Sequence, residues 1–271
     1  MNQHLNQNLD YAAMRGDLEE ALANKEFHLA YQPVINVKTG QTTSAEVLLR
    51  WNHPQWGDLS PRIFLPVAEA IGLTFSLTET ILQMLCKQGV DWMMEGLAKI
   101  DLSANISPSQ FSSIALPEVV GSVLEQTGFP AENLILEIPE STMLSEYEDI
   151  CPVLQALEQL GIQMIVDDLG KDSMSLDLLG KAGISGAKLY SNIIQNCESD
   201  THTHAVIHAL TAYAEERKCF IGAKGIESND QLQFALEHGI ENVQGYRISK
   251  PLRSDMFSTW RHETNQWCET C

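Results

Sequence analysis

The sequence predicts an α/β fold, a modified TIM-like (β/α)8 barrel in which the first strand pair is antiparallel. Eight strand-like segments, most of them alternating with helix-like segments, fill about 240 residues, the usual size of one such barrel. The first two strands, over residues 27–37 and 45–51, are joined by a short turn. Because a parallel connection needs about a dozen residues, these strands should be antiparallel neighbours. An open doubly wound sheet is the alternative, but no glycine-rich phosphate loop follows the first strand.

The remaining elements follow in a regular order. A short helix is expected over residues 17–24, because Leu18, Ala21 and Leu22 share one face. The other strands are expected over residues 98–106, 133–138, 163–168, 186–190, 219–226 and 242–249. Helices are expected over residues 61–72, 77–94, 108–127, 141–160, 173–182, 202–218 and 229–238, with a last helix after Pro251. The chain is accordingly divided into a polar lead-in over residues 1–17, a single barrel domain over residues 18–265 and a C-terminal tail over residues 266–271.

The composition is that of a globular and strongly acidic domain. Hydrophobic residues make up 44% of the chain, and 36 acidic residues against 17 basic ones give a formal charge of −19. Such a surface repels phosphate backbones and anionic lipid headgroups, which argues against nucleic-acid and membrane-surface binding. A small anionic ligand is compatible with this charge if local cations or metals outweigh the global field. Since no apolar run reaches the ~18 residues of a membrane span and the N-terminus is polar, we expect a cytoplasmic protein with reduced cysteines.

One of the predicted strands carries a carboxylate among apolar residues. Glu46 lies in the segment Ala45–Trp51. Burying an unpaired carboxylate is costly, so Glu46 needs a cation, a metal ion or several hydrogen-bond donors as a partner. Further polar residues recur near the C-terminal ends of the predicted strands, where barrels of this class place their sites. They are Gln32, Arg50, Asn105, Glu137, Glu140, Asp167, Asp168, Lys188, Lys224, Glu227 and Gln244.

The convergence of these side chains indicates a particular chemistry. A single acid at a strand end is usually a helix cap or a solvated residue. Several strands that converge with carboxylates and amides are different, because like charges so close together cannot all ionise without a cation. Oxygen-rich clusters suit Mg²⁺, Mn²⁺ or Ca²⁺, and paired divalent ions commonly serve phosphodiester hydrolysis. The layout therefore favours a barrel that handles a phosphate compound through oxygen-bound metal.

Short segments along the chain form a recognisable series. They are Tyr31-Gln32-Pro33, Glu46-Val47-Leu48-Leu49-Arg50-Trp51, Phe64-Leu65-Pro66-Val67-Ala68-Glu69, Asn105-Ile106-Ser107-Pro108, Leu136-Glu137-Ile138-Pro139-Glu140-Ser141, Asp167-Asp168, and Gln244-Gly245-Tyr246 running to Ser249-Lys250-Pro251. Their order and spacing resemble the EAL domain family of cyclic di-GMP phosphodiesterases. The resemblance covers residues 18–260, and Val47 in place of the alanine of the name motif is a mild change.

The resemblance implies roles for individual residues. The first metal ion would be bound by Glu46, Asn105, Glu137 and Asp167, and the second by Asp167 and Asp168. Lys188 would orient the attacking water, and Glu140 would anchor the loop after the fifth strand. Contacts to the dinucleotide would come from Gln32, Glu46, Leu49, Arg50, Glu227 and Gln244, with Arg50 on a phosphate.

The chain departs from the family's pattern at the seventh strand. The family's motif Ala-Glu-Gly-Val-Glu reads here Ala223-Lys224-Gly225-Ile226-Glu227, so Lys224 replaces a metal-binding glutamate. An ammonium group cannot ligate Mg²⁺ and repels it. We expect Lys224 to take the place of the second metal ion and to pair with Asp167 or Asp168. The alternative is a surface lysine beside a first metal site that still binds its ion.

Two further departures affect the same region. The family's loop Asp-Asp-Phe-Gly-Thr-Gly-Tyr-Ser-Ser-Leu runs here over residues 167–176, with Lys171 and Asp172 in place of the threonine and the second glycine. Asp172 loses the free positive φ of glycine, and the aromatic positions are gone. The Lys-Ile-Asp motif of the sixth strand ends here in Tyr190, so another acid is missing. In the family this loop shapes metal binding and dimer contact.

The departures predict a degenerate EAL domain that no longer hydrolyses cyclic di-GMP. Such a domain would act as a nucleotide receptor or as an interaction module for a regulatory protein partner, and the sequence does not separate these two functions. The alternative is a residual phosphodiesterase that uses Mg²⁺ or Mn²⁺ at one site and forms linear pGpG. No metal cofactor is expected if Lys224 replaces the second metal ion, and a homodimer is compatible with either function.

Overall fold

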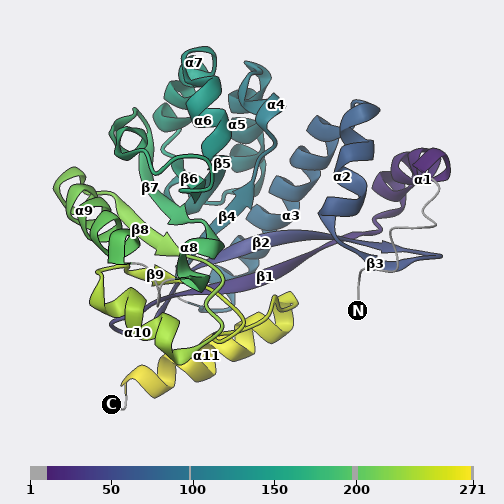
Figure 1. Cartoon of the computed structure of the whole chain (residues 1–271). Helices are drawn as coiled ribbons and strands as arrows, with labels where there is room; N and C mark the ends of the chain where they lie inside the picture. The colour runs from purple at the N-terminus through teal and green to yellow at the C-terminus, as the bar shows by residue number, and fades with distance from the viewer. Residues whose placement is uncertain (1–10, 98, 197–200, 270–271) are drawn as a thin grey trace.

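The strands of the protein form one sheet that closes into a barrel. The computed structural model describes residues 11–97, 99–196 and 201–269 of the chain. Within these ranges the strand order is β1-β9-β8-β7-β6-β5-β4-β2-β3, and a further pairing of β1 with β2 closes the barrel and leaves only β3 outside it (Figure 1). The strands are β1 Phe27–Asn36, β2 Thr42–His53, β3 Gly57–Leu59, β4 Asp101–Asn105, β5 Leu134–Pro139, β6 Gln163–Leu169, β7 Ile184–Leu189, β8 Phe220–Ala223 and β9 Asn242–Val243.

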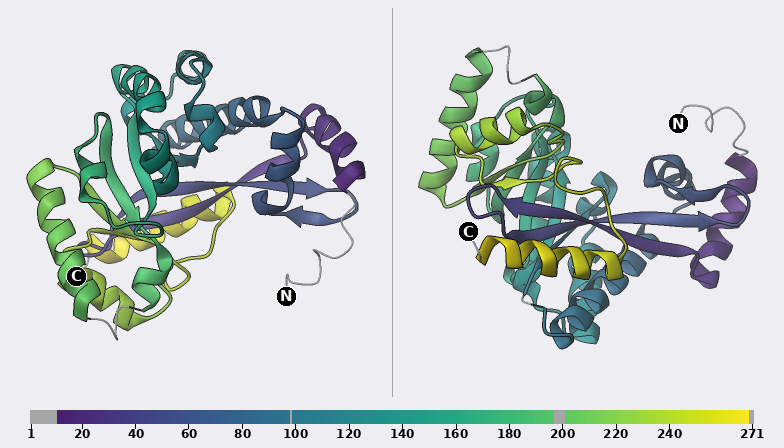
Figure 2. Two further views of the ribbon diagram at one scale, coloured as in Figure 1. Left: turned by 45° about the horizontal axis from the view of Figure 1, so that its top comes forward. Right: turned by 90° about the horizontal axis from the view of Figure 1, so that it is seen from below.

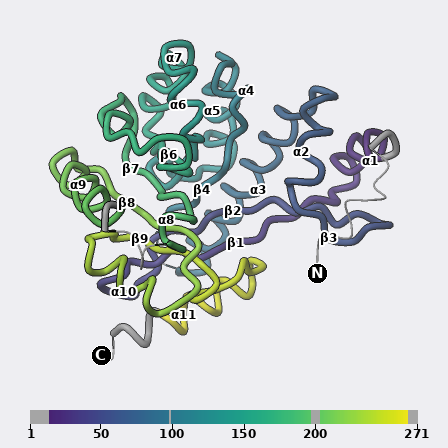
Figure 3. Tube along the Cα trace, in the orientation of Figure 1, coloured from purple at the N-terminus to yellow at the C-terminus, as the bar shows by residue number. Residues whose placement is uncertain are grey.

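The strand directions confirm the predicted modified barrel. β1 is antiparallel to both of its barrel neighbours, β2 and β9. The other barrel neighbours, from β2 through β4 to β9, are parallel. The β1–β2 hairpin is long and extends beyond the barrel wall (Figure 2). The Cα trace shows α1, α2 and β3 gathered at that extended end, with α9 and α10 at the opposite end (Figure 3).

Helices cover the outside of the barrel. They are α1 Tyr11–Asn24, α2 Pro61–Ala70, α3 Thr74–Met94, α4 Pro108–Phe111, α5 Ala115–Thr127, α6 Glu140–Ser145, α7 Tyr147–Gln159, α8 Ser191–Gln195, α9 Thr201–Arg217, α10 Asn229–Glu237 and α11 Ser254–Glu269, and short 3-10 helices span Ala131–Asn133 and Leu176–Gly180. No helix in the described ranges is long and apolar enough to cross a membrane.

Several element boundaries differ from the expected ones. The helix expected over residues 173–182 is only a 3-10 turn at Leu176–Gly180, and the loop before it donates the backbone N–H groups of Asp172 and Ser173 to the side chain of Glu140. The helices expected over residues 108–127 and 141–160 are each broken into two. α1 begins at Tyr11, inside the expected lead-in, and α11 continues to Glu269, inside the expected tail; residues 1–10, 270 and 271 lie outside the described ranges. β3 and α8 were not expected.

The last strand is shorter than expected for a specific steric reason. The sequence predicts a strand over residues 242–249, but β9 ends at Val243. Immediately afterwards the chain passes very close to the segment that follows β8. A Cβ on Gly245 would lie 2.1 Å from the carbonyl oxygen of Ile226 in that segment. The N–H of Arg247 also donates to that oxygen, at 3.0 Å. This close approach turns the chain across the mouth of the barrel and brings Gln244 over it.

The alternation of β2 positions Glu46 for the site. Val47, Leu49 and Trp51 are buried in the hydrophobic core, where Trp51 packs against Phe64 with ring centroids 5.5 Å apart. Because successive side chains of a strand point to opposite faces, Glu46 points to the interior of the barrel. Its cross-strand partner in the register is Gln32 on β1. Burial of the outer face therefore fixes the direction of the polar inner face.

Candidate functional site

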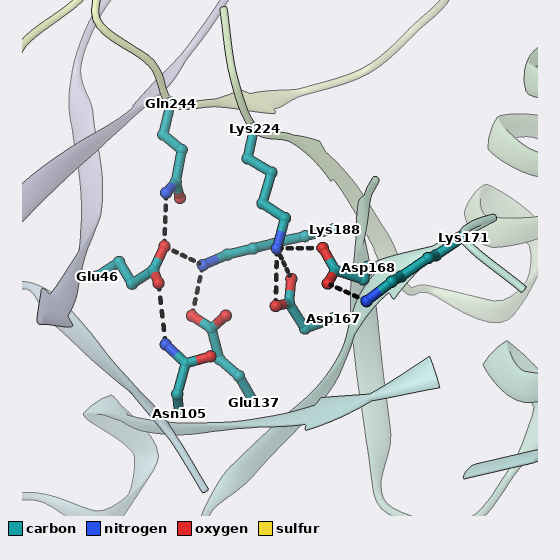
Figure 4. A network of polar contacts seen from close by, with 9 residues as sticks. All are labelled: Glu46, Asn105, Glu137, Asp167, Asp168, Lys171, Lys188, Lys224 and Gln244. Atoms are coloured by element: carbon teal, nitrogen blue, oxygen red, sulfur yellow. Dashed lines mark hydrogen bonds and ion pairs between the residues drawn. The ribbon is translucent and has the colours of Figure 1, made fainter. Parts of the chain in front are cut away.

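The candidate site lies at the C-terminal mouth of the barrel (Figure 4). Almost every strand contributes to it, so the site depends on closure of the barrel rather than on any one segment. The contributing residues are Glu46 on β2, Asn105 at the end of β4, Glu137 on β5, Asp167 and Asp168 on β6, Lys188 on β7, Lys224 after β8 and Gln244 after β9.

Glu46 is the hub of the hydrogen bonds at this mouth. The Nδ2 of Asn105 donates to Oε1 of Glu46 at 2.9 Å, and the Nε2 of Gln244 donates to Oε2 at 2.5 Å. The ammonium of Lys188 lies 3.4 Å from the same Oε2. Burial alone would raise the pKa of Glu46, but Lys188 and the hydrogen bond from Gln244 lower this pKa to about 2. Glu46 is therefore an ionised carboxylate with the partners that its burial requires.

Lys188 and Glu137 form a buried ion pair below Glu46. The Nζ of Lys188 is in direct contact with Oε1 of Glu137, and both side chains are buried. Burial alone would lower the pKa of Lys188, but Glu137 and Glu46 raise this pKa above its usual value. The pKa of Glu137 is raised to about 7, mainly by burial. The positive charge of Lys188 lowers this pKa, while the carboxylates of Glu46 and Asp167 raise it further. The second oxygen of Glu137, Oε2, is buried and has no hydrogen-bond partner.

Lys224 bridges the two aspartates of β6. Its Nζ lies 2.7 Å from Oδ1 and 2.7 Å from Oδ2 of Asp167, and 2.6 Å from Oδ1 of Asp168. Burial would lower the pKa of Lys224, but the two aspartates raise it, so the lysine is cationic. The predicted ion pair is confirmed, and it engages both aspartates rather than one of them. Asp168 adopts a positive φ of 56°, a conformation uncommon for a non-glycine residue, in the turn that brings its carboxylate to the lysine.

The two expected metal sites differ in how well this arrangement suits them. Glu46, Asn105, Glu137 and Asp167 supply the oxygen donors that a hard divalent ion prefers, and the unpartnered oxygen of Glu137 is available to one. Lys188 already contacts Glu46 and Glu137, and Lys224 contacts Asp167, so a single divalent ion would bind here only after these ammonium groups move. The space between Asp167 and Asp168 holds the ammonium of Lys224, so these residues do not fit a second ion. As the side chains are arranged, the described residues contain no group of three His, Cys, Asp or Glu ready to hold a metal.

A cleft with a volume of about 1130 Å³ opens above this network. The predicted nucleotide contacts all line it, namely Gln32, Glu46, Leu49, Arg50, Glu227 and Gln244. Lys171, Tyr190 and Lys224 line the same cleft, whereas Glu137, Lys188 and Glu140 do not. Asp58 on β3 and Arg62 on α2 also face the cleft, although the sequence pattern did not indicate them. The available signal was Pro61, a residue typical of a helix start, because Arg62 follows it directly and Asp58 lies three residues before it.

The loop after β6 is fixed from below by Glu140. Oε2 of this buried side chain accepts the backbone N–H groups of Asp172, at 2.9 Å, and Ser173, at 3.4 Å. A carboxylate that accepts backbone N–H groups forms strong hydrogen bonds in a buried setting. Asp172 therefore keeps the loop in place through its backbone, even though its side chain differs from the family's glycine. Glu140 is placed where the expected loop anchor should be.

The fold and the site define a class of barrel with an antiparallel first strand pair and an acid-rich mouth. Residues 15–251 match the family model described as the EAL domain, which covers most of the chain. The chain belongs to the EAL domain family.

Named relatives agree with this membership. The chain is 30% identical over 239 residues to the bifunctional diguanylate cyclase/cyclic di-GMP phosphodiesterase MucR of Pseudomonas aeruginosa, across 88% of this chain and 35% of MucR. It is 32% identical over 245 residues to the cyclic di-GMP phosphodiesterase RocR of the same organism, across 89% of this chain and 61% of RocR. The chain therefore spans less than two thirds of the length of these relatives.

Solved structures agree as well. The phosphodiesterase of MucR in complex with c-di-GMP superimposes with a TM-score of 0.84 at 30% identity, over 90% of this chain and 99% of that chain. The EAL domain of FimX from Xanthomonas citri, in complex with c-diGMP, has a TM-score of 0.81 at 22% identity over 90% of this chain and 94% of that chain. The FimX likeness supports the fold alone.

Proposed function

We propose that this EAL domain binds cyclic di-GMP as a regulatory receptor and does not hydrolyse it. The observation that carries the proposal is the ammonium of Lys224, which contacts both Asp167 and Asp168. A lysine cannot lower the pKa of a bound water as a divalent ion does, so no activated hydroxide is formed at that position. Losing this activation costs a phosphodiesterase many orders of magnitude in rate.

The binding half of the proposal is supported by the cleft. Its volume of about 1130 Å³ is at the large end of small-ligand sites, which suits a dinucleotide. Gln32, Arg50 and Glu227 all face this space. Relatives and solved structures named for cyclic di-GMP share the same family and fold. An intact pocket above a blocked metal position is the arrangement expected of a receptor.

A receptor of this kind needs a second protein to read its bound state. We place that regulatory partner outside the cleft, because the cleft is taken by the nucleotide in the active complex. The partner would recognise the surface that changes when the dinucleotide is bound. This role distinguishes the receptor from a pure interaction module, in which the partner binds whether or not nucleotide is present.

A residual phosphodiesterase is the second candidate function. It is favoured by one observation, the buried and unpartnered Oε2 of Glu137. A single Mg²⁺ or Mn²⁺ ion would be held by Glu46, Asn105, Glu137 and Asp167, and would supply Lewis-acid activation when bound. Lys224 opposes this function, because it already contacts both oxygens of Asp167.

The experiment is a calorimetric titration of cyclic di-GMP into the protein, with and without Mg²⁺, followed by chromatography of the mixture. The receptor predicts saturable binding in both conditions and recovery of intact dinucleotide. Arg50→Ala should abolish this binding while leaving the thermal unfolding temperature unchanged. Absence of heat in both conditions, at protein concentrations well above micromolar, would contradict the proposed function.

A further inference from the structure

We propose that Lys171, supported by Tyr190, is an anion-binding group that takes a phosphate oxygen of the ligand in the cleft. This inference rests on the proposed function and assigns a contact within the same site. Lys171 and Tyr190 both line the cleft. Both also stand at positions where the sequence departs from the family's pattern. The ligand class is a phosphodiester anion, which is the charged part of a cyclic dinucleotide.

The charges around the two aspartates leave Lys171 available. Lys224 forms three close contacts with the aspartates, at 2.6–2.7 Å, and an ammonium has three N–H groups to give. Lys171 lies 3.8 Å from Oδ2 of Asp168, beyond hydrogen-bond distance, and its side chain is 52% exposed. The charge of Asp168 is therefore compensated mainly by Lys224. Lys171 is the lysine of this cluster that can turn toward a ligand without losing a close ionic contact.

The backbone and the ring beside Lys171 hold it ready. The N–H of Lys171 donates to the carbonyl of Asp168 at 3.0 Å, and the next residue is fixed to the buried Glu140. The N–H of Tyr190 donates to Leu169 at 3.0 Å, which places the tyrosine ring beside the loop. The Nζ of Lys171 lies 5.9 Å from the centroid of this ring, within the range of a cation–π contact. A fixed backbone lowers the entropy that binding must overcome.

The local charge contrasts with the rest of the protein. The whole chain has 36 acidic against 17 basic residues, so an anionic ligand is repelled at long range. A half-exposed lysine at the cleft counters this repulsion where the phosphate enters. A contact of this kind raises the association rate and makes affinity depend on salt. It needs no divalent ion, so binding should persist in a chelator.

The test compares two lysine–tyrosine pairs of the same kind. Lys181 lies 4.4 Å from the ring centroid of Tyr147, and neither residue lines the cleft. Cyclic di-GMP is titrated into wild type, Lys171→Ala, Lys171→Arg and Lys181→Ala in EDTA, at low and at moderate salt. We expect Lys171→Ala to weaken binding about 5- to 10-fold and to reduce the salt dependence. Lys171→Arg and Lys181→Ala should bind like wild type.

The outcomes separate this inference from the proposed function. If wild type binds and Lys171→Ala binds equally well, the inference is wrong and the receptor stands. If Lys171→Ala and Lys181→Ala weaken binding to the same extent, the effect is one of net charge and the inference is again wrong. If wild type shows no binding, both fail. Thermal unfolding of each variant shows whether it is folded, and Tyr190→Phe, which keeps the ring, should retain affinity while Tyr190→Leu loses part of it.

Discussion

The ammonium of Lys224 lies 2.7 Å from each carboxylate oxygen of Asp167, although 57 residues separate them in the chain. The same ammonium contacts Asp168 at 2.6 Å. One lysine thus supplies, within the fold, a positive charge that compensates two neighbouring aspartates. A cation that is part of the chain cannot exchange with solvent or polarise water as a metal ion does. The proposed receptor function depends on this contact.

Replacing Lys224 by glutamate should change how the protein responds to metal. Lys224→Glu places a third carboxylate beside Asp167 and Asp168, so like charges repel and the thermal unfolding temperature should fall in EDTA. Mn²⁺ should restore much of this loss, because binding to the folded state stabilises it. Wild type should gain little from Mn²⁺ in the same thermal scan. A variant that ignores Mn²⁺ would show that the lysine does not stand at a metal position.

The neutral variant Lys224→Met is the matched control for Lys224→Glu. It removes the cation without adding an acid, and the long side chain is kept. It should lose about 2–4 kcal/mol of unfolding free energy in urea titrations, because a partly buried aspartate pair is left uncompensated. Equal stability of Lys224→Met and wild type would mean that the ion pair contributes nothing to the fold.

Neutralising Glu46 should lower the free energy of unfolding of the protein. Glu46→Gln removes the charge that faces Lys188 while keeping the size of the side chain, and it leaves a buried ammonium with one carboxylate fewer. We expect a loss of about 2–4 kcal/mol in urea-induced unfolding. Glu237→Gln on α10 removes the charge of an exposed glutamate that also accepts a side-chain hydrogen bond, and it should change stability by less than about 0.5 kcal/mol. Similar losses in both variants would contradict the buried network.

The loop after β6 should loosen when its anchor is removed. Glu140→Ala deletes the acceptor of the N–H groups of Asp172 and Ser173. Hydrogen exchange of the peptide that contains these two amides should become faster, by about 5- to 150-fold, for a loss of 1–3 kcal/mol in local stability. Exchange in β1, which lies opposite β6 in the closed barrel, should be unchanged. Unaltered exchange at Asp172 and Ser173 would show that the loop is held by other contacts.

The close approach at Gly245 offers a steric test of the site's geometry. Gly245→Ala would place a Cβ 2.1 Å from the carbonyl oxygen of Ile226, so the backbone must move. We expect a loss of more than about 3 kcal/mol, together with weaker cyclic di-GMP binding as Gln244 shifts. Gly128→Ala is the control, since its φ of +71° is strained for alanine but the space around it is open, and it should lose about 1 kcal/mol. Equal losses of stability in the two variants would mean that position 245 accommodates a Cβ.

Local patterns were enough to predict most of the barrel. The strand expected over residues 133–138 is observed as β5 Leu134–Pro139, because its apolar run is bounded by clear turn signals. The short link between the first two strands predicted their antiparallel pairing correctly. The end of β9 at Val243 was not predictable, since it is set by contact of Gly245 with Ile226, a segment distant in the sequence.

The sequence predicted which residues form the site, but not all of the hydrogen bonds and ion pairs between them. Family resemblance indicated Glu46, Asp167 and Lys224, and the structure brings them to one mouth. The hydrogen bond from Gln244 to Glu46 and the buried contact of Lys188 with Glu137 were not expected. Both depend on how the strands are staggered around the closed barrel, which no local segment encodes.

Prolonged incubation of the protein with cyclic di-GMP and excess Mn²⁺, followed by chromatographic separation of the nucleotides, shows whether the domain hydrolyses its ligand. If Lys224 has replaced the second metal ion, the dinucleotide is recovered intact and no linear pGpG is formed above a protein-free control. Clear formation of pGpG that disappears in Glu46→Ala would contradict the proposed function, because turnover would then proceed with Lys224 beside Asp167 and Asp168.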